Sequence, residues 1–205
     1  MVELEDFKSV WAQYNQKLDN SLKLNIELFK KLNLDKSSRE LNKVFIYELI
    51  GVVSCSVFLI FLIVITFRFV HEPRFFIPGI VSVIITVVLT WFTIRKAILL
   101  SKIDYVSQPV LQLQKNINRF NVSYIIFRKW ELMLYPIFCI AIPPVIWKFL
   151  TNFDAYEHYT RYVMAIIFAI VAGFVIMYWV YYKWYDKKIK NAQTFLKELD
   201  EYNNE

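Results

Sequence analysis

The chain has 205 residues, of which 57% are hydrophobic and 18% aromatic, and its formal net charge at pH 7 is +6. A soluble domain has about 45–50% apolar residues. Here the excess is concentrated in four long apolar blocks, and a chain of this length lacks the surface to bury four such helices in water. These totals exclude an ordinary soluble domain.

The first 43 residues are polar and are expected to form a cytoplasmic amphipathic helical segment. Their apolar side chains recur in steps of three and four, which is the heptad spacing of coiled coils. The positions of this seam are Leu4, Phe7, Trp11, Tyr14 and Leu18. The run "LDKSSRE" then predicts a helix break at Asp35–Ser38, where Ser37 or Ser38 would cap the next helix.

Two uses of this seam follow from its spacing. It packs with the other cytoplasmic segments or with a second copy of the chain, or it stays free and binds another protein as a helix in a groove. In the second case Trp11 is the expected anchor, because aromatic residues dominate binding hot spots.

Each of the four apolar blocks is about as long as the roughly 20 residues that a helix needs to cross a bilayer. They predict an all-α membrane protein with four transmembrane helices. The expected spans are residues 44–70, 75–94, 132–150 and 162–182, which together make a transmembrane domain over 44–182.

Basic residues predict the orientation of these spans, because Lys and Arg accumulate in cytoplasmic segments. Segments 1–43, 95–130 and 183–205 carry 8, 7 and 5 of the 24 Lys and Arg residues. Both termini and the central segment are therefore expected in the cytoplasm.

The central segment 95–130 is expected to form a basic helical hairpin, and 183–205 a helical tail. After a break near "SQP", an apolar stripe steps 3, 4 and 3 through Val110, Leu113, Ile117 and Phe120. The positive charge of this segment fits either a topology signal or contact with an acidic partner or anionic lipid. No nucleic-acid motif is present, so no nucleic-acid partner is expected.

Small and hydroxylated side chains within the spans predict helix packing. Small residues at every fourth position allow close helix contact. The two predicted faces are Ala165, Ala169 and Gly173 on the fourth span, and Ser82, Thr86 and Thr90 on the second. The second row offers a pore lining as its alternative.

Two prolines predict a bend in the third span. Pro143 and Pro144 remove backbone donors in its second half, which frees carbonyls near Cys139 and Ile140. The bend serves either packing shape or a hinge.

Charged residues within the spans are few. Glu48 lies about one turn inside the first span and Glu131 opens the third. An orienting role near the interface is expected, with Glu48 paired to Lys43 or to a basic residue of 95–130. No catalytic, cofactor or metal site is predicted, because His71 and His158 lack ligand-motif spacing.

Two stretches carry a family resemblance. "DFKSVWAQYNQKLDNSLKLN", with Trp11 and Asn15 spaced by three residues, and "IDYVSQPVLQLQKNINRFNVSYIIFRKWELMLYP" resemble an uncharacterised family of small four-span membrane proteins of Bacteroidota-type bacteria. Such proteins are often encoded beside extracytoplasmic-function sigma factors. The resemblance implies a multi-pass protein of the bacterial inner membrane, and a regulator whose cytoplasmic helices mask a sigma factor.

The sequence as a whole predicts a non-enzymatic integral membrane protein whose cytoplasmic helices mediate protein interaction. Its expected partners are membrane lipid and either a cytoplasmic protein, such as a sigma factor, or a second copy. The alternative is a small transporter or channel subunit, whose water-filled path would follow Ser82, Thr86, Thr90 and the proline bend.

Overall fold

The computed structural model of the chain describes residues 2–105, 108–152, 154–157 and 159–204, and it describes side chains for these residues except 2–10, 12, 13 and 200–204. Within these ranges the fold is all helical, without a strand. Four helices are long and apolar enough to cross a membrane. This supports the prediction of a multi-pass membrane protein.

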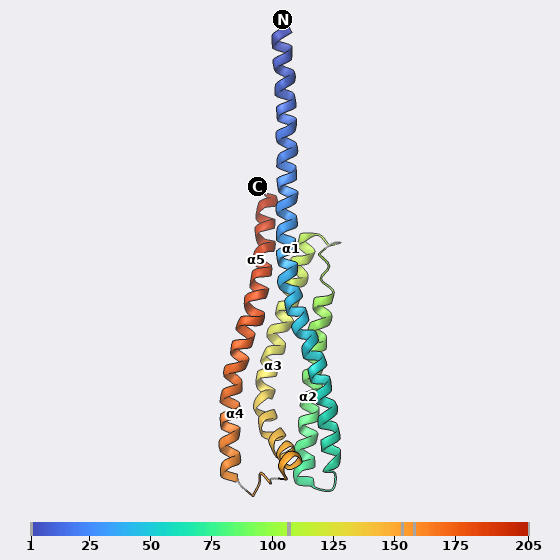
Figure 1. Ribbon diagram of the computed structural model, residues 1–205, viewed down its shortest axis with the longest axis vertical. Helices are drawn as coiled ribbons and strands as arrows, with labels where there is room; N and C mark the ends of the chain where they lie inside the picture. The colour runs from blue at the N-terminus through green and yellow to red at the C-terminus, as the bar shows by residue number, and fades with distance from the viewer. Residues whose placement is uncertain (1, 106–107, 153, 158, 205) are drawn as a thin grey trace.

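The helices form an elongated bundle (Figure 1). In chain order they are α1 (Val2–Arg68), α2 (Pro73–Ser101), α3 (Val110–Thr151), α4 (Tyr159–Val180), the π-helix η1 (Tyr181–Asp186) and α5 (Lys187–Asn204). The last three follow one another without a break, so they make one long rod, of which α5 packs against α1. The N-terminal part of α1 extends well beyond the end of α5 (Figure 1).

The predicted break at Asp35–Ser38 is wrong, because α1 passes through it as one helix of 67 residues. Serine favours a cap when its hydroxyl is available to the local backbone. Ser37 is instead fully buried, and its hydroxyl donates to the carbonyl of Ala192 at 3.1 Å and lies 3.0 Å from the Tyr105 hydroxyl. A tertiary contact therefore satisfies the group that suggested the cap.

One apolar core occupies the half of the bundle nearer the termini. It joins α1, the end of α2, the first half of α3 and the rod of η1 and α5. Its buried members include Leu41, Val44, Leu100, Leu113, Ile117, Phe120, Tyr124, Ile189, Ala192, Leu196 and Leu199. Three of the four residues in the predicted stripe of the central segment, all but Val110, are thus fully buried.

Within the predicted central segment, α2 continues to Ser101 and α3 begins at Val110. The third and fourth spans, however, are parts of longer helices. No proline or glycine occurs between Val110 and Glu131, so nothing ends α3 before it reaches the apolar block. The same applies to the passage from α4 through η1 into α5.

In the other half of the bundle, some pairs of helices pack more closely than others. α1 and α2 form a close pair: a Cβ added at Gly79 would lie 2.7 Å from Thr66 of α1, so only glycine fits this approach. α3 packs against α2, and α4 packs against α3. Figure 1 shows α4 standing at the side of the bundle away from α1.

Candidate functional site

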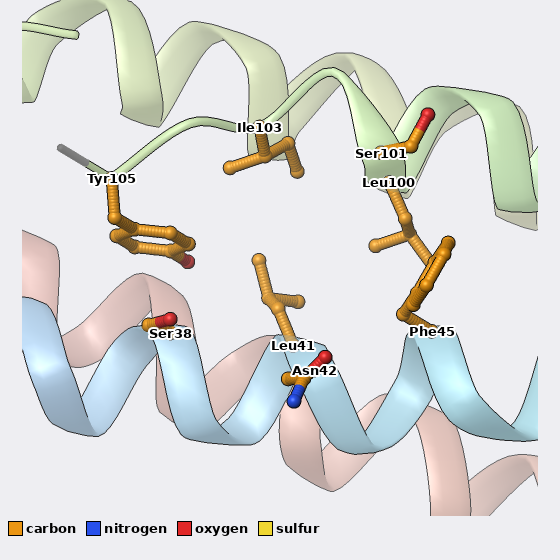
Figure 2. Close-up of a pocket in the computed structure, with 8 residues that line it drawn as sticks. All are labelled: Ser38, Leu41, Asn42, Phe45, Leu100, Ser101, Ile103 and Tyr105. Carbon is orange, nitrogen blue, oxygen red and sulfur yellow. The ribbon is translucent and has the colours of Figure 1, made fainter. Parts of the chain in front are cut away.

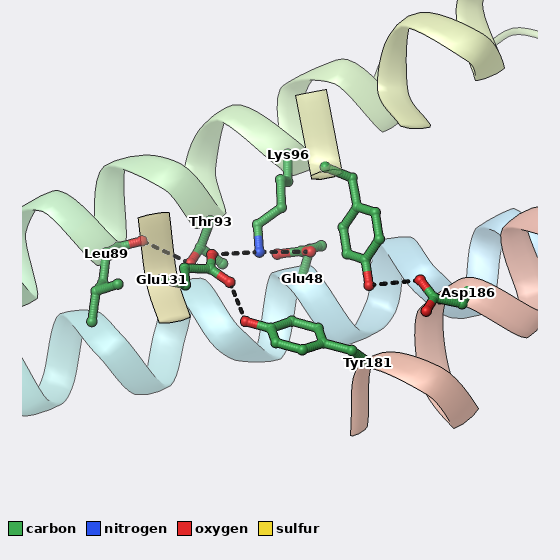
Figure 3. A network of polar contacts seen from close by, with 8 residues as sticks. Glu48, Leu89, Thr93, Lys96, Glu131, Tyr181 and Asp186 are labelled. Carbon is green, nitrogen blue, oxygen red and sulfur yellow. Dashed lines mark hydrogen bonds and ion pairs between the residues drawn. The ribbon is translucent and has the colours of Figure 1, made fainter. Parts of the chain in front are cut away.

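Three charged side chains meet where α1, α2 and α3 come together (Figure 3). Lys96 of α2 places its Nζ 3.0 Å from Oε1 of Glu131 on α3 and 3.3 Å from Oε1 of Glu48 on α1. Glu48 is 1% exposed and Lys96 is 5% exposed. The predicted partner of Glu48 is therefore a basic residue of segment 95–130; Lys43 pairs with Glu40 instead.

The π-helix η1 supplies a fourth side to this network. The Tyr181 hydroxyl donates to Oε2 of Glu131 (Figure 3). One turn further on, Asp186 accepts a hydrogen bond from Tyr124 at 3.1 Å and one from Arg128 at 2.9 Å. A π-turn widens the helix and is frequently found at functional sites. Here it places Tyr181 and Asp186 toward α3 within six residues.

The buried network is unbalanced in charge. When both carboxylates are ionised, Glu48 and Glu131 face one ammonium group, that of Lys96. Burial of charge is costly unless the charges pair closely, so this arrangement fixes how α1, α2 and α3 align. It also leaves negative potential at the centre of the bundle.

A cavity of about 310 Å³ lies beside the network. Its polar side is formed by Glu48, Lys96, Glu131, Tyr181 and Tyr185, and its remaining walls come from Tyr47, Gly51, Cys55, Leu89, Thr93, Tyr135, Phe138, Met177 and Val180. The lining of the cavity thus combines apolar and aromatic residues with the charged residues of the network.

A smaller hollow lies under the connection between α2 and α3. Figure 2 shows Ile103 and Tyr105 of this connection pointing toward Leu41 and Ser38 of α1. The volume of the hollow is about 200 Å³. Burial raises the pKa of Tyr105 to about 12, against a smaller lowering by its hydrogen bond to Ser37. The tyrosine anchors the connection to α1.

The predicted interaction seam lies on the part of α1 that projects beyond the bundle. Trp11 is 57% exposed and Tyr14 is 66% exposed, and Leu18 is exposed as well. Leu4 and Phe7 belong to the same helix, but their side chains lie outside the described residues. The first buried side chain along the described part of α1 is Asn33.

The predicted small-residue face of α4 lies against α3. The hydroxyl of Tyr135 donates to the carbonyl of Ala169 at 2.8 Å. A Cβ added at Gly173 would lie 1.6 Å from that hydroxyl. Glycine at this position therefore admits the tyrosine, while Ala165, about two turns earlier, is partly buried.

The predicted hydroxyl row of α2 is buried. Ser82, Thr86 and Thr90 each donate to the carbonyl four residues earlier in α2, at 2.8–2.9 Å. None of the three lines the cavity beside the network, whereas Thr93, three residues after Thr90 in α2, does.

The two predicted bend prolines, Pro143 and Pro144, lie inside α3, which stays helical through them. In Figure 1 the last turns of α3 turn away from the long axis that its earlier part follows. Pro144 cannot donate to the carbonyl of Ile140. The hydroxyl of Tyr162 on α4 donates to that carbonyl instead, at 2.6 Å.

A tyrosine hydroxyl also bonds to the carbonyl that a second proline leaves without a backbone donor. Pro78 lies inside α2 and cannot donate to the carbonyl of Arg74. The hydroxyl of Tyr156 donates there at 3.1 Å. Burial, with Asp154 as a smaller cause, raises the pKa of Tyr156, so the hydroxyl keeps the proton that it donates.

The sequence showed Glu48 and Glu131 singly but not the network. Each lies near the end of its predicted span, which is the usual place for an interfacial charge. The network could have been suspected because Lys96 directly follows the second predicted span, at a depth in the membrane similar to that of Glu48 and Glu131. Among the described residues, no group of three or more His, Cys, Asp and Glu is placed to hold a metal ion.

The fold and site together define a class, a multi-pass helical membrane protein with a buried ionic network. Comparisons with protein-family models, curated proteins and solved structures give no match. The resemblance to a family encoded beside sigma factors therefore stays a prediction from the sequence.

Proposed function

We propose that the protein is a non-enzymatic, membrane-anchored interaction protein, and that the projecting part of α1 binds a soluble protein in the cytoplasm. The spanning helices are the anchor. The specific form of the proposal is a regulator that holds a sigma factor at the inner membrane, as the sequence resemblance implies.

One observation carries this proposal: a single stripe of side chains along α1 is buried by the bundle in one part and exposed to solvent in another. From Asn33 through Ser37 and Leu41 the stripe is buried by the rest of the bundle. Steps of three and four residues continue it toward the N-terminus. Its exposed positions there are Trp11, Tyr14, Leu18, Leu22 and Ile26.

Exposed apolar surface of this extent is unusual on a monomer in water. Contiguous apolar patches above a few hundred Å² mark sites of interaction. An isolated helix is also marginal in water without tertiary packing of its apolar face. A partner protein with an apolar groove would provide that packing, with Trp11 as the largest inserted side chain.

A photo-crosslinking experiment on the full chain in cells tests the proposal. A benzophenone amino acid placed at Leu18 lies on the stripe, whereas the same group at Lys23 lies on the polar side. We expect an adduct with a second, soluble protein at Leu18, none at Lys23, and loss of the adduct when Trp11→Ala is added.

The masses of the adducts separate the alternatives. An adduct at Leu18 that contains only a second copy of the chain would show self-association and contradict the proposal. No adduct at Leu18 would contradict it as well. For the sigma-factor form, Trp11→Ala should raise transcription from the promoters of that sigma factor, while Lys23→Ala should not.

The transporter or channel alternative has less support. A water-filled path along α2 needs hydroxyls that face water. Those of Ser82, Thr86 and Thr90 are buried and already donate within their own helix.

A further inference from the structure

The cavity beside the buried network is independent of the projecting part of α1. We propose that this cavity binds a hydrophobic organic cation, with the carboxylates of Glu48 and Glu131 as its counter-ions. The proposal goes beyond protein interaction, since it assigns a small-molecule site to the spanning helices.

The charge of the network selects a cation. With both carboxylates ionised, Glu48 and Glu131 carry two negative charges, and Lys96 neutralises one of them. The nearby pair of Arg128 and Asp186 is balanced by itself, with 2.9 Å between Nη1 and Oδ2. A bound monovalent cation would bring the network to neutrality, whereas an anion would add to the excess.

Glu48 contributes a buried carboxylate to the lining of this cavity. Its side chain is almost fully buried, and its Oε1 is 3.3 Å from Lys96 but accepts no hydrogen bond from the described residues. A buried oxygen without a hydrogen bond is costly. Because Glu48 lines the cavity, a cationic group held there would lie beside its carboxylate.

The walls of the cavity suit an apolar cation rather than a metal ion. Leu89, Phe138, Met177 and Val180 supply apolar surface, and Tyr47 and Tyr135 supply rings. Aromatic faces attract organic ammonium groups. The volume of about 310 Å³ is at the lower end of the range for ligand pockets, which implies a small ligand.

The cavity lies where α1 and α4 are separated. Both helices line it. Among the described residues, α4 contacts α3, and no comparable contact joins α4 to α1. We expect a cation that dissolves in the bilayer to enter between these two helices.

Binding of benzyltrimethylammonium to the full-length protein in lipid nanodiscs tests the proposal, with phenylmethanesulfonate as an anion of matched body. Titration calorimetry should show saturable binding of the cation and none of the anion. Glu48→Gln should lower the affinity for the cation by about tenfold or more. Glu40→Gln, outside the cavity, should change affinity by less than about twofold.

A second variant tests the cavity without changing a charge. Val180→Phe fills part of the space and should also weaken binding by about tenfold or more. Thermal unfolding of each variant identifies those that fold, and if Glu48→Gln does not fold, Val180→Phe decides the matter. The proposal is overturned if the cation does not bind, if the anion binds as well as the cation, or if folded variants at both positions keep full affinity.

Discussion

Single tyrosine hydroxyls donate hydrogen bonds to the carbonyls that prolines in the helices leave without a backbone donor. In a membrane core there is no water to replace a lost donor, so a free carbonyl must find a partner in the protein. Tyr162 reaches the carbonyl that Pro144 leaves without its usual donor. The same contact joins α4 to α3, so the proline bend also determines where the fourth helix packs.

This pairing predicts a non-additive double-mutant cycle. Tyr162→Phe removes the donor and should lower the free energy of unfolding by about 1 kcal/mol. In a Pro144→Ala background the cost should be much smaller, because the alanine N–H can bond to the Ile140 carbonyl. Unfolding of both pairs in detergent measures the coupling. Equal costs in the two backgrounds would show that the hydroxyl does not serve that carbonyl.

The anchor residue of the α2–α3 connection predicts a pH effect. The pKa of Tyr105 is raised from 10.0 to about 12 in the folded state, mainly by burial. The folded protein therefore holds this proton more tightly than the unfolded chain does. The resulting stabilisation is complete below pH 10 and is lost between pH 10 and about 12.

The ultraviolet absorbance of phenolate measures this titration as the difference between the native protein and Tyr105→Phe. We expect a midpoint near pH 12 in the folded protein. A midpoint at the ordinary tyrosine value would mean that the connection does not bury the ring against α1.

At the scale of helices, the network of Glu48, Lys96 and Glu131 joins α1, α2 and α3 through buried ion pairs. Apolar packing tolerates sliding and rotation of helices in lipid, whereas a buried ion pair accepts only one alignment. η1 adds the fourth element through Tyr181. The network thus specifies which faces of the long helices meet.

Loss of the central ammonium group should be strongly destabilising. Lys96→Met leaves two buried carboxylates without compensation, and we expect a loss of about 3–5 kcal/mol in the free energy of unfolding. Adding Glu48→Gln and Glu131→Gln should recover most of it. Arg95→Met is the matched control, since Arg95 is partly exposed beside Trp91 and should cost less than about 1 kcal/mol.

Unfolding in detergent, together with the amount of each variant in the membrane, compares these four proteins. If Lys96→Met and Arg95→Met behave alike, the network does not hold the helices together.

The sequence predicted those elements whose signal is local. Four long apolar blocks predict four membrane-crossing helices, and all four are present. Leu113, Ile117 and Phe120 of the predicted apolar stripe are buried. The break near Ser37 was wrong, because a serine satisfied by Ala192, 155 residues away, looks the same in sequence as a helix cap.

The site was less predictable because it depends on depth. Glu48, Lys96 and Glu131 each resemble an interfacial charge, and only the register of three helices brings them within hydrogen-bond distance. The π-turn at Tyr181–Asp186 has no distinct residue pattern. The seam that contains Trp11 and Leu18 could be predicted from the sequence, because its spacing of three and four residues is a local pattern.

At the scale of the whole molecule, α1 connects the spanning bundle to the projecting seam as one helix. It contains no proline, and its only glycine is Gly51, within the first predicted span. Sharp bends need a proline, a glycine or a π-bulge in most cases. The projecting part should therefore move with the bundle as a single rigid body.

Spin-label distances test this rigidity. Labels at Asn20→Cys and Asn42→Cys, with Cys55→Ala and Cys139→Ala, are separated by 22 helical residues. We expect one narrow distance distribution near 33 Å, from a rise of about 1.5 Å per residue. A shorter or broad distribution would show that the helix does break at Asp35–Ser38.

The length of α1 has a consequence for which molecules can meet its tip. From Val44, where the first span is predicted to begin, to Trp11 the helix rises about 50 Å. The potential of a charged lipid surface decays over roughly 8 Å at physiological ionic strength. A protein bound at Trp11 is therefore too far from the lipid headgroups to contact them or to feel their electrostatic potential. The helix sets a fixed height above the membrane, and this height favours partners that approach from solution over partners that lie on the bilayer.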